Sequence, residues 1–188
     1  MRGLVSAVVC VLALAAVPAF AQPPVQSTHL VSFGLGGGVS VPVADAKDAF
    51  ENGYNGTGFV QLNVHQLPIA LRLNFTFQKF NFDEAKVGTG GSGTVLGGLA
   101  NVQYSLGVGM LRPYIIAGLG AYNVKTEPDN ASSVSDTRFG VNGGAGLIVK
   151  LSQISLFAEG RVDNVFTEKG LIDTKQIQVV PVTFGLVY

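Results

Sequence analysis

The sequence is poor in the residues that most functional sites require. It has one cysteine, no tryptophan and two histidines. The single cysteine, Cys10, excludes an internal disulfide and a metal site built from thiolates. Charged residues make up 13% of the chain, and the 12 basic and 12 acidic residues cancel. Because a nucleic-acid-binding surface usually leaves a basic excess, no nucleic-acid partner is expected.

Long apolar runs are also missing after residue 21, although the mean hydropathy of the chain is +0.39. A transmembrane helix needs roughly 18 such residues in a row. The 25 glycines recur inside apolar segments, where helices tolerate them badly. Alternating strands with one face towards lipid explain both observations.

The first 21 residues have the pattern of a cleaved secretory signal. Arg2 supplies the positive start, residues 4–17 form an apolar core, and residues 19–21 (Ala-Phe-Ala) place small side chains where a signal peptidase cuts. We expect cleavage after Ala21, which leaves a cysteine-free outer-membrane β-barrel domain over residues 22–188.

Two other interpretations fit this segment less well. Residues 3–21 could serve as an uncleaved membrane anchor, but the run is short and ends in a good cleavage pattern. A lipoprotein signal would place a small residue before the cysteine, whereas Val9 precedes Cys10.

Eight segments of the mature chain alternate apolar and polar residues with a period of two. In the first, Val31, Phe33 and Leu35 share one face, and small residues share the other. Past Lys79 the apolar phase flips, which predicts either a bulge or the end of the membrane band. The expected strands cover about residues 30–43, 60–65, 69–78, 96–106, 114–124, 138–149, 155–163 and 180–188.

The connections between these strands alternate in length. Those near 44–57, 83–93, 126–137 and 167–176 are long and polar, and those near 66–68, 107–112 and 152–153 are short. Transmembrane barrels have long external loops and tight periplasmic turns. The sequence therefore predicts an all-β fold, an eight-stranded antiparallel up-and-down transmembrane β-barrel with both termini periplasmic.

A soluble barrel or sandwich is the main alternative for an alternating all-β chain. Its polar face would carry many Lys and Glu residues towards water. Here the polar face is built from Gly, Ser, Asn, Gln and a few charges, which is typical of a cramped barrel lumen.

The last nine residues, Val180 to Tyr188, resemble the closing strand of small OmpA-like and OmpX-like outer-membrane β-barrels. The resemblance implies that Gly185, Leu186 and Tyr188 belong to the signal that the barrel-assembly machinery reads, although the family usually ends in Phe. It also implies a bacterial outer-membrane location, periplasmic chaperones during biogenesis, and contact with outer-membrane lipid and lipopolysaccharide.

Five charged residues fall on the polar phase of their strands. An eight-stranded barrel is just wide enough to be filled by side chains, and buried charges must pair. We therefore expect an internal charge network that plugs the lumen; a gate whose pairs re-sort is the functional alternative. The residues are Arg72, Arg138, Glu159, Arg161 and Asp163.

The favoured function is a structural or interaction role in the envelope, such as envelope integrity or adhesion through surface loops. The loops Ala44–Thr57 and Glu127–Thr137 are the candidates for contact with host surfaces, phage or lipopolysaccharide. The alternative is a narrow, porin-like channel for small solutes or hydrophobic ligands. A monomer is expected.

Catalysis and metal binding have little support. Some small barrels are lipid A deacylases or palmitoyl transferases, but His29 and His65 lie outside any His-Ser motif that would activate a nucleophile. The loop acids show no calcium-loop spacing. We expect no enzyme activity, no cofactor and no metal site.

Aromatic residues are expected in belts at the two membrane interfaces. Tyr104 and Tyr188 are assigned to the periplasmic side. Six more are expected near the external rim, where some of them would form the belt: Tyr54, Phe59, Phe80, Phe82, Phe139 and Phe166.

Overall fold

The computed structural model describes residues 30–48, 50–64, 67–87, 90–107, 109–129, 132–151, 153–166 and 177–188. The predicted signal peptide (residues 1–21) and both histidines lie outside the described residues.

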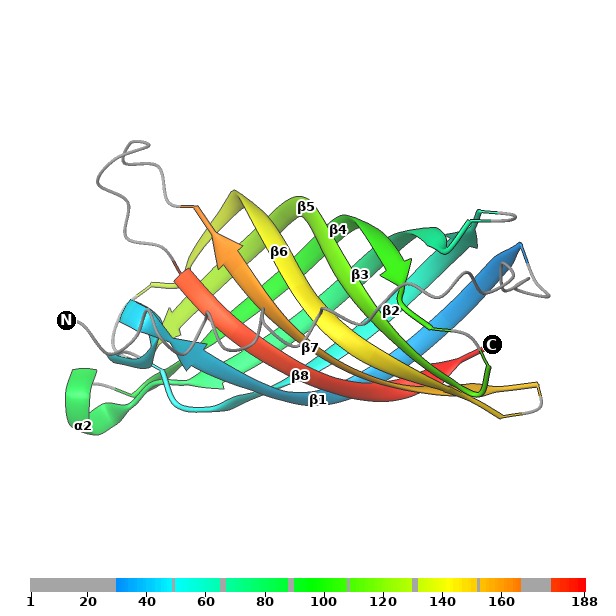
Figure 1. Cartoon of the computed structure of the whole chain (residues 1–188). Coiled ribbons are helices and arrows are strands. Elements are labelled where there is room, and N and C mark those ends of the chain that lie inside the picture. Colours follow the sequence, from blue (N-terminus) through cyan, green and yellow to red (C-terminus); the bar gives the residue numbers. More distant parts are fainter. Residues whose placement is uncertain are drawn as a thin grey trace, which may run out of the picture.

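Eight antiparallel strands form one closed barrel in chain order, and β1 pairs with β8 to complete it (Figure 1). This confirms the predicted eight-stranded up-and-down barrel. The strands are β1 (Val31–Val43), β2 (Gly53–Asn63), β3 (Ile69–Asn81), β4 (Gly91–Ser105), β5 (Leu111–Pro128), β6 (Val134–Lys150), β7 (Ser155–Val165) and β8 (Ile177–Val187).

The barrel is apolar on the outside and polar on the inside. On β3, Leu73 and Phe75 are 59% and 72% exposed, whereas Arg72 and Asn74 between and beside them are 2% and 1% exposed. This is the reverse of a water-soluble barrel. The exposed apolar face is the surface that a lipid bilayer covers.

Helices are short in the described part of the chain. A 3₁₀ segment, η2 (Ala44–Asp48), follows β1, and one helical turn, α2 (Glu84–Val87), lies between β3 and β4. No helix among the described residues is long and apolar enough to span a membrane.

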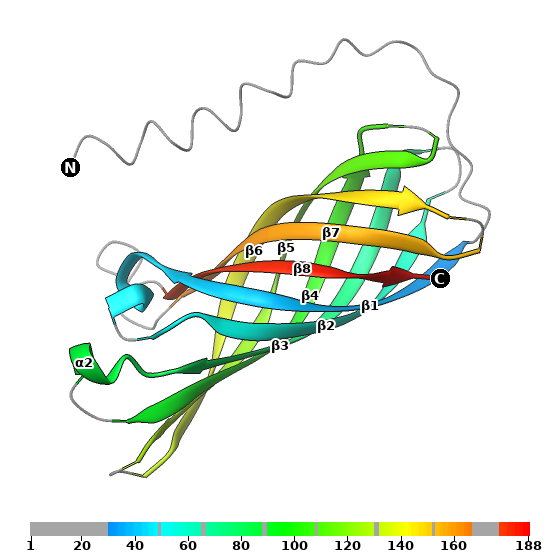
Figure 2. The ribbon, with the colours of Figure 1, turned by 90° about the horizontal axis from the view of Figure 1, so that it is seen from below.

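The two ends of the barrel differ in their connections (Figure 2). At the short-turn end, residues 64–68, 106–110 and 151–154 join the strands. At the long-loop end the connections are residues 44–52, 82–90, 129–133 and 166–176. The chain terminus lies at the short-turn end, where Tyr188 N donates to Phe33 O at 2.8 Å.

The third predicted loop is mostly strand. Residues 126–137 were expected to be irregular, but Thr126 pairs with Val134 and Asn123 with Thr137. The backbone groups of this polar segment are therefore satisfied by a hairpin that continues β5 and β6 beyond the apolar band. In the first predicted loop, likewise, Gly53–Thr57 already belongs to β2.

The phase change after Lys79 marks the end of the membrane band and not a bulge. The pairing of β3 with β4 continues without a break through Lys79↔Thr94 and Phe80↔Gly93. Phe80 therefore points inward. It packs at the long-loop end of the lumen in an apolar cluster with Val95, Leu99, Tyr122, Val165 and Val179.

Glycines on the lumen face leave room for large neighbouring side chains. A Cβ added at Gly34 would collide with the ring of Phe59, and one added at Gly140 would lie 2.7 Å from the ring of Tyr122. An eight-stranded lumen cannot hold a large side chain at every inward position. The small residues that alternate along these strands are thus a packing requirement.

Replacing Gly34 with alanine is expected to destabilise the barrel by about 1–3 kcal/mol, because overpacking displaces Phe59. The measurement is the urea midpoint of the refolded barrel, followed by its heat-dependent gel mobility. Gly98→Ala is the matched control, since a Cβ there meets nothing within 4 Å. Equal midpoints for the two variants would contradict the packing argument.

Candidate functional site

Glu159 is the centre of the lumen's polar contacts. Its Oε2 accepts hydrogen bonds from Arg72 Nη1 at 2.8 Å and from the Tyr114 hydroxyl at 2.7 Å, and its Oε1 accepts one from Arg161 Nε at 2.7 Å. None of these four residues is more than 5% exposed. Side chains from β3, β5 and β7 therefore meet across the barrel interior around one carboxylate.

Aromatic rings complete the surroundings of Arg72. Its guanidinium carbon lies 3.4 Å from the centre of the Phe59 ring and 5.7 Å from that of Phe157. The two rings meet edge to face with centroids 5.6 Å apart. A planar guanidinium stacks well on such faces, so the Phe59 ring packs against the guanidinium of Arg72.

Asn74 links the two guanidinium groups. With its amide oxygen turned towards them, it accepts from Arg72 Nη2 at 3.2 Å and from Arg161 Nη2 at 3.1 Å. In that orientation the amide nitrogen of Asn74 lies 3.0 Å from the amide of Asn101 on the neighbouring strand β4. The two arginines therefore share two acceptors, the amide oxygen of Asn74 and the carboxylate of Glu159.

A second set of hydrogen bonds crosses the lumen through Asp163. Gln78 Nε2 donates to Asp163 Oδ2 at 2.9 Å, and the Ser40 hydroxyl donates to Gln78 Oε1 at 3.0 Å. Asn55 donates to Ser40 at 3.3 Å and accepts from Thr183 at 2.9 Å. Five strands are connected by these side chains: β7, β3, β1, β2 and β8.

The structure distributes the five predicted lumen charges unevenly. Arg72 and Arg161 each contact Glu159, and Asp163 belongs to the neighbouring hydrogen-bonded set. Arg138 lies apart from them, near the long-loop end of β6, where it pairs with Asp136 and its side chain is 21% exposed. Its position on β6 has the lumen phase, but it lies at the long-loop limit of the membrane band, next to Thr137.

Sequence reasoning missed the uncharged partners. Tyr114, Asn74 and Gln78 lie on the lumen phase of their strands and each contacts a charged group. The alternation in the sequence shows that these residues face the lumen. It does not show which of them meet, because contacts across the lumen depend on the shear of the barrel.

The aromatic residues assigned to the external rim separate into two groups. Phe59, Phe80 and Phe82 are at most 9% exposed and point inward. Phe80 and Phe82 lie at the long-loop end as predicted, but they face inward and cannot join an outer belt. The rim assignment of Phe59 is wrong, because Phe59 pairs with Gly34 in the half of the barrel nearer the short turns. At Phe59 the facing Gly34 leaves space for the ring. The outward-facing group is Tyr54, Phe139 and Phe166, of which Phe139 and Phe166 stack with centroids 6.3 Å apart.

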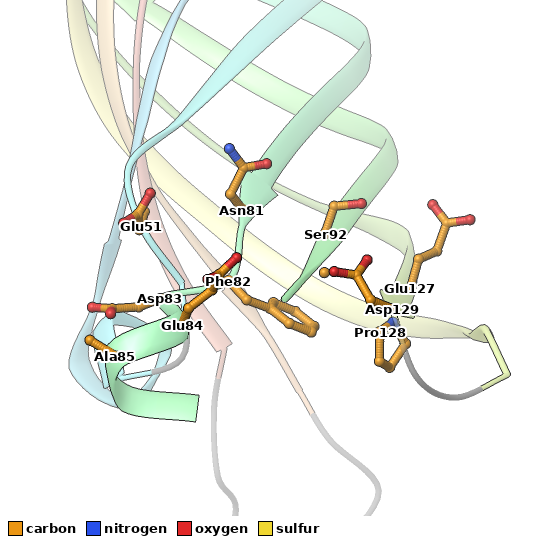
Figure 3. Close-up of a pocket in the computed structure, with 11 residues that line it drawn as sticks. Glu51, Asn81, Phe82, Asp83, Glu84, Ala85, Ser92, Glu127, Pro128 and Asp129 are labelled. Carbon is orange, nitrogen blue, oxygen red and sulfur yellow. The ribbon is translucent and has the colours of Figure 1, made fainter. Parts of the chain in front are cut away.

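An open pocket of about 760 Å³ lies at the long-loop end (Figure 3). Carboxylates dominate its lining, with Phe82 and Ser92 beside them. No group of three His, Cys, Asp or Glu side chains in the described ranges is placed to hold a metal ion. The acidic residues are Glu51, Asp83, Glu84, Glu127 and Asp129.

The three residues of the predicted assembly signal lie on the closing strand and its end. Leu186 and Tyr188 face outward and are 51% and 71% exposed, which suits contact with lipid. Gly185 faces inward, and a Cβ there would lie 2.5 Å from the Phe157 ring. Each of the three therefore has a packing or surface role in the folded barrel, in addition to any role in assembly.

Comparison with known proteins points to one family. The model for the outer membrane protein beta-barrel domain matches residues 7–180. Neisserial surface protein A (NspA) superposes with a TM-score of 0.62 at 11% identity, covering 85% of this chain and 96% of that one. A major outer membrane protein from Thermus thermophilus has a TM-score of 0.57 at 13% identity, with 85% and 99% coverage. These likenesses concern the fold. None of the curated proteins matches the sequence.

Replacing Glu159 with glutamine is expected to lower the unfolding free energy by on the order of 3 kcal/mol, because two buried guanidinium groups lose their counter-charge. Asp136→Asn is the matched control: its side chain is 48% exposed, and the loss of its pair with Arg138 should cost less than about 1 kcal/mol. Urea titration of both refolded variants measures the difference. A Glu159→Gln midpoint equal to that of the wild type would show that the buried contacts add no net stability.

Proposed function

Because the chain belongs to the outer membrane protein beta-barrel domain family, we propose that it is an envelope protein whose lumen is closed by side chains and whose external surface makes its specific contacts. The protein is an outer-membrane β-barrel of a bacterium. The proposed role is structural or adhesive and includes no enzymatic step.

One observation carries the proposal of a closed lumen. Glu159 receives hydrogen bonds from three side chains of three strands, and the rings of Phe59 and Phe157 lie against the Arg72 side of this cluster. All of these groups are at most 5% exposed. In so narrow a barrel, a charged cluster that reaches across the interior leaves little width for a solute.

The hairpin formed by β5 and β6 at the long-loop end is the surface we favour for an interaction. Asn123 donates to Thr137 at 3.0 Å and accepts from Ser135 at 3.1 Å, so polar side chains join the two strands outside the membrane band. Lys125 pairs with Glu127 at 2.6 Å. A polar hairpin held rigidly above the membrane can present a defined contact surface to lipopolysaccharide, phage or a host cell.

A narrow channel is the second candidate, and one observation favours it. Buried polar atoms of Thr76, Asn142 and Arg161 have no hydrogen-bond partner among the protein atoms described. Such atoms are commonly satisfied by water, and water in the lumen would begin a hydrated path.

Single-channel recording in planar bilayers separates the two candidates. We expect no steady conductance from the refolded wild type, because the cluster around Glu159 blocks the path. Arg161→Ala removes one arm of the cluster and tests whether closure depends on it. Steady openings of the wild-type protein would overturn the closed-lumen proposal and favour the channel.

Shortening the external hairpin tests the interaction role. Replacing residues 127–133 with an Asn-Gly turn, which joins the paired residues Thr126 and Val134, should keep the barrel folded, because the removed residues lie beyond the membrane band. Bacteria that carry this variant should adhere less to cultured epithelial cells than bacteria with the wild type. The control is equal surface amount and unchanged heat-dependent mobility. Undiminished adherence would exclude the hairpin as the contact surface.

A further inference from the structure

The outward face of the barrel ends differently at its two ends. At the long-loop end, polar residues terminate the apolar face: Lys79 on β3, Asn123 on β5 and Thr137 on β6. At the short-turn end the apolar face continues into the turns themselves. The exposed apolar side chains there are Leu67 (53%), Leu106 (53%), Met110 (69%), Leu111 (56%), Leu151 (47%) and Ile154 (44%).

The length of the apolar face along β5 shows how deep the turns lie relative to the lipid. On β5 the apolar outward positions run from Leu111 to Ala121, which is 11 residues, and Asn123 is the next outward position. A tilted strand needs about 9–11 residues to cross the hydrocarbon core. The band is therefore used completely, and no length of strand remains to hold the turns away from the lipid. The excess length of β5, through Pro128, extends on the other side.

Backbone N–H groups in the turns are hydrogen-bonded, as an apolar environment requires. Leu67 N donates to Val64 O at 3.3 Å, and Leu151 N donates to Ile154 O at 3.0 Å. The pairing of β5 with β6 also extends to the first turn residue, since Lys150 N donates to Met110 O at 2.7 Å. Unpaired backbone groups are what excludes loops from lipid, and these bonds reduce that cost.

The charges at this end favour a phospholipid surface. Arg112 and Lys150 are the charged side chains of the described residues in 62–69, 102–113 and 147–156. No carboxylate side chain accompanies them in those ranges. Both lie on the inward phase of their strands, and Arg112 Nε donates to Gly109 O at 2.9 Å, so these cations stay at the rim of the short-turn end, at the level where lipid phosphates lie.

We propose that the short-turn end is embedded in the inner leaflet of the outer membrane. The side chains of Leu67, Met110 and Leu151 contact lipid there, and Arg112 and Lys150 lie at the level of the phosphates. The occupant of this apolar surface is phospholipid, continuous with the lipid around the barrel, and not a periplasmic protein. The inference is independent of whether the lumen is closed.

Site-directed spin labelling tests the depth of the turns. Cys10 lies in the predicted signal peptide, so a chain refolded from residue 22 has no cysteine of its own. Met110→Cys and Val134→Cys form a matched pair, because the two residues are 69% and 66% exposed but lie at opposite ends of the barrel. Each variant is labelled and refolded into vesicles of phosphatidylethanolamine and phosphatidylglycerol. Collisions with oxygen and with a water-soluble nickel chelate are then compared.

We expect the label at position 110 to be relaxed by oxygen and protected from the nickel chelate, and the label at 134 to show the reverse. These vesicles contain no other protein, so protection at 110 can only come from lipid or from the barrel itself. Leu151→Cys gives a second reading from a different turn and serves if the first variant does not fold. Nickel access at 110 and 151 equal to that at 134 would overturn the proposal.

Discussion

Closure of the hydrogen-bonded sheet is the constraint on which the rest of this structure depends. Lipid offers no partner to a backbone N–H or C=O group, so a sheet with a free edge cannot remain in a bilayer. Here β1 pairs with β8 from Gly34↔Val187 to Val43↔Gln178, and Tyr188 bonds to Phe33 beyond the last strand. Once the sheet is closed with eight strands, the interior has a limited width, and every inward side chain must share it.

That limited width explains the composition of the lumen face. Large rings such as those of Phe59 and Tyr114 are accommodated where a neighbouring strand carries glycine, as Gly34 does for Phe59 and Gly146 for Tyr114. Burial in turn requires that the charged groups be paired, and Glu159 supplies the acceptor for two arginines. The outer face has the opposite requirement, because apolar side chains are stable in contact with lipid and charged side chains are destabilising there.

Much of this could be predicted from the sequence, for a physical reason. The period of two along each segment predicts which residues face in and which face out. The alternation of long and short connections predicts which end of the barrel is external. The boundaries were less predictable: segment 126–137 is polar like a loop but is held as a hairpin by backbone pairing. Phe80 and Arg138 also illustrate the limit, since alternation gives the face of a side chain but not whether it lies within the membrane band.

The sequence by itself determined the class of fold, the order of the strands, the apolar outer face and the set of polar residues that could enter the lumen. These follow from local alternation and turn composition, which each segment carries alone. Only the tertiary structure decided that Arg72 and Arg161 meet at Glu159, that Asp163 joins Gln78, and that Arg138 pairs with Asp136 near the long-loop end. Such contacts depend on the stagger between strands, a property of the closed barrel that no single segment contains.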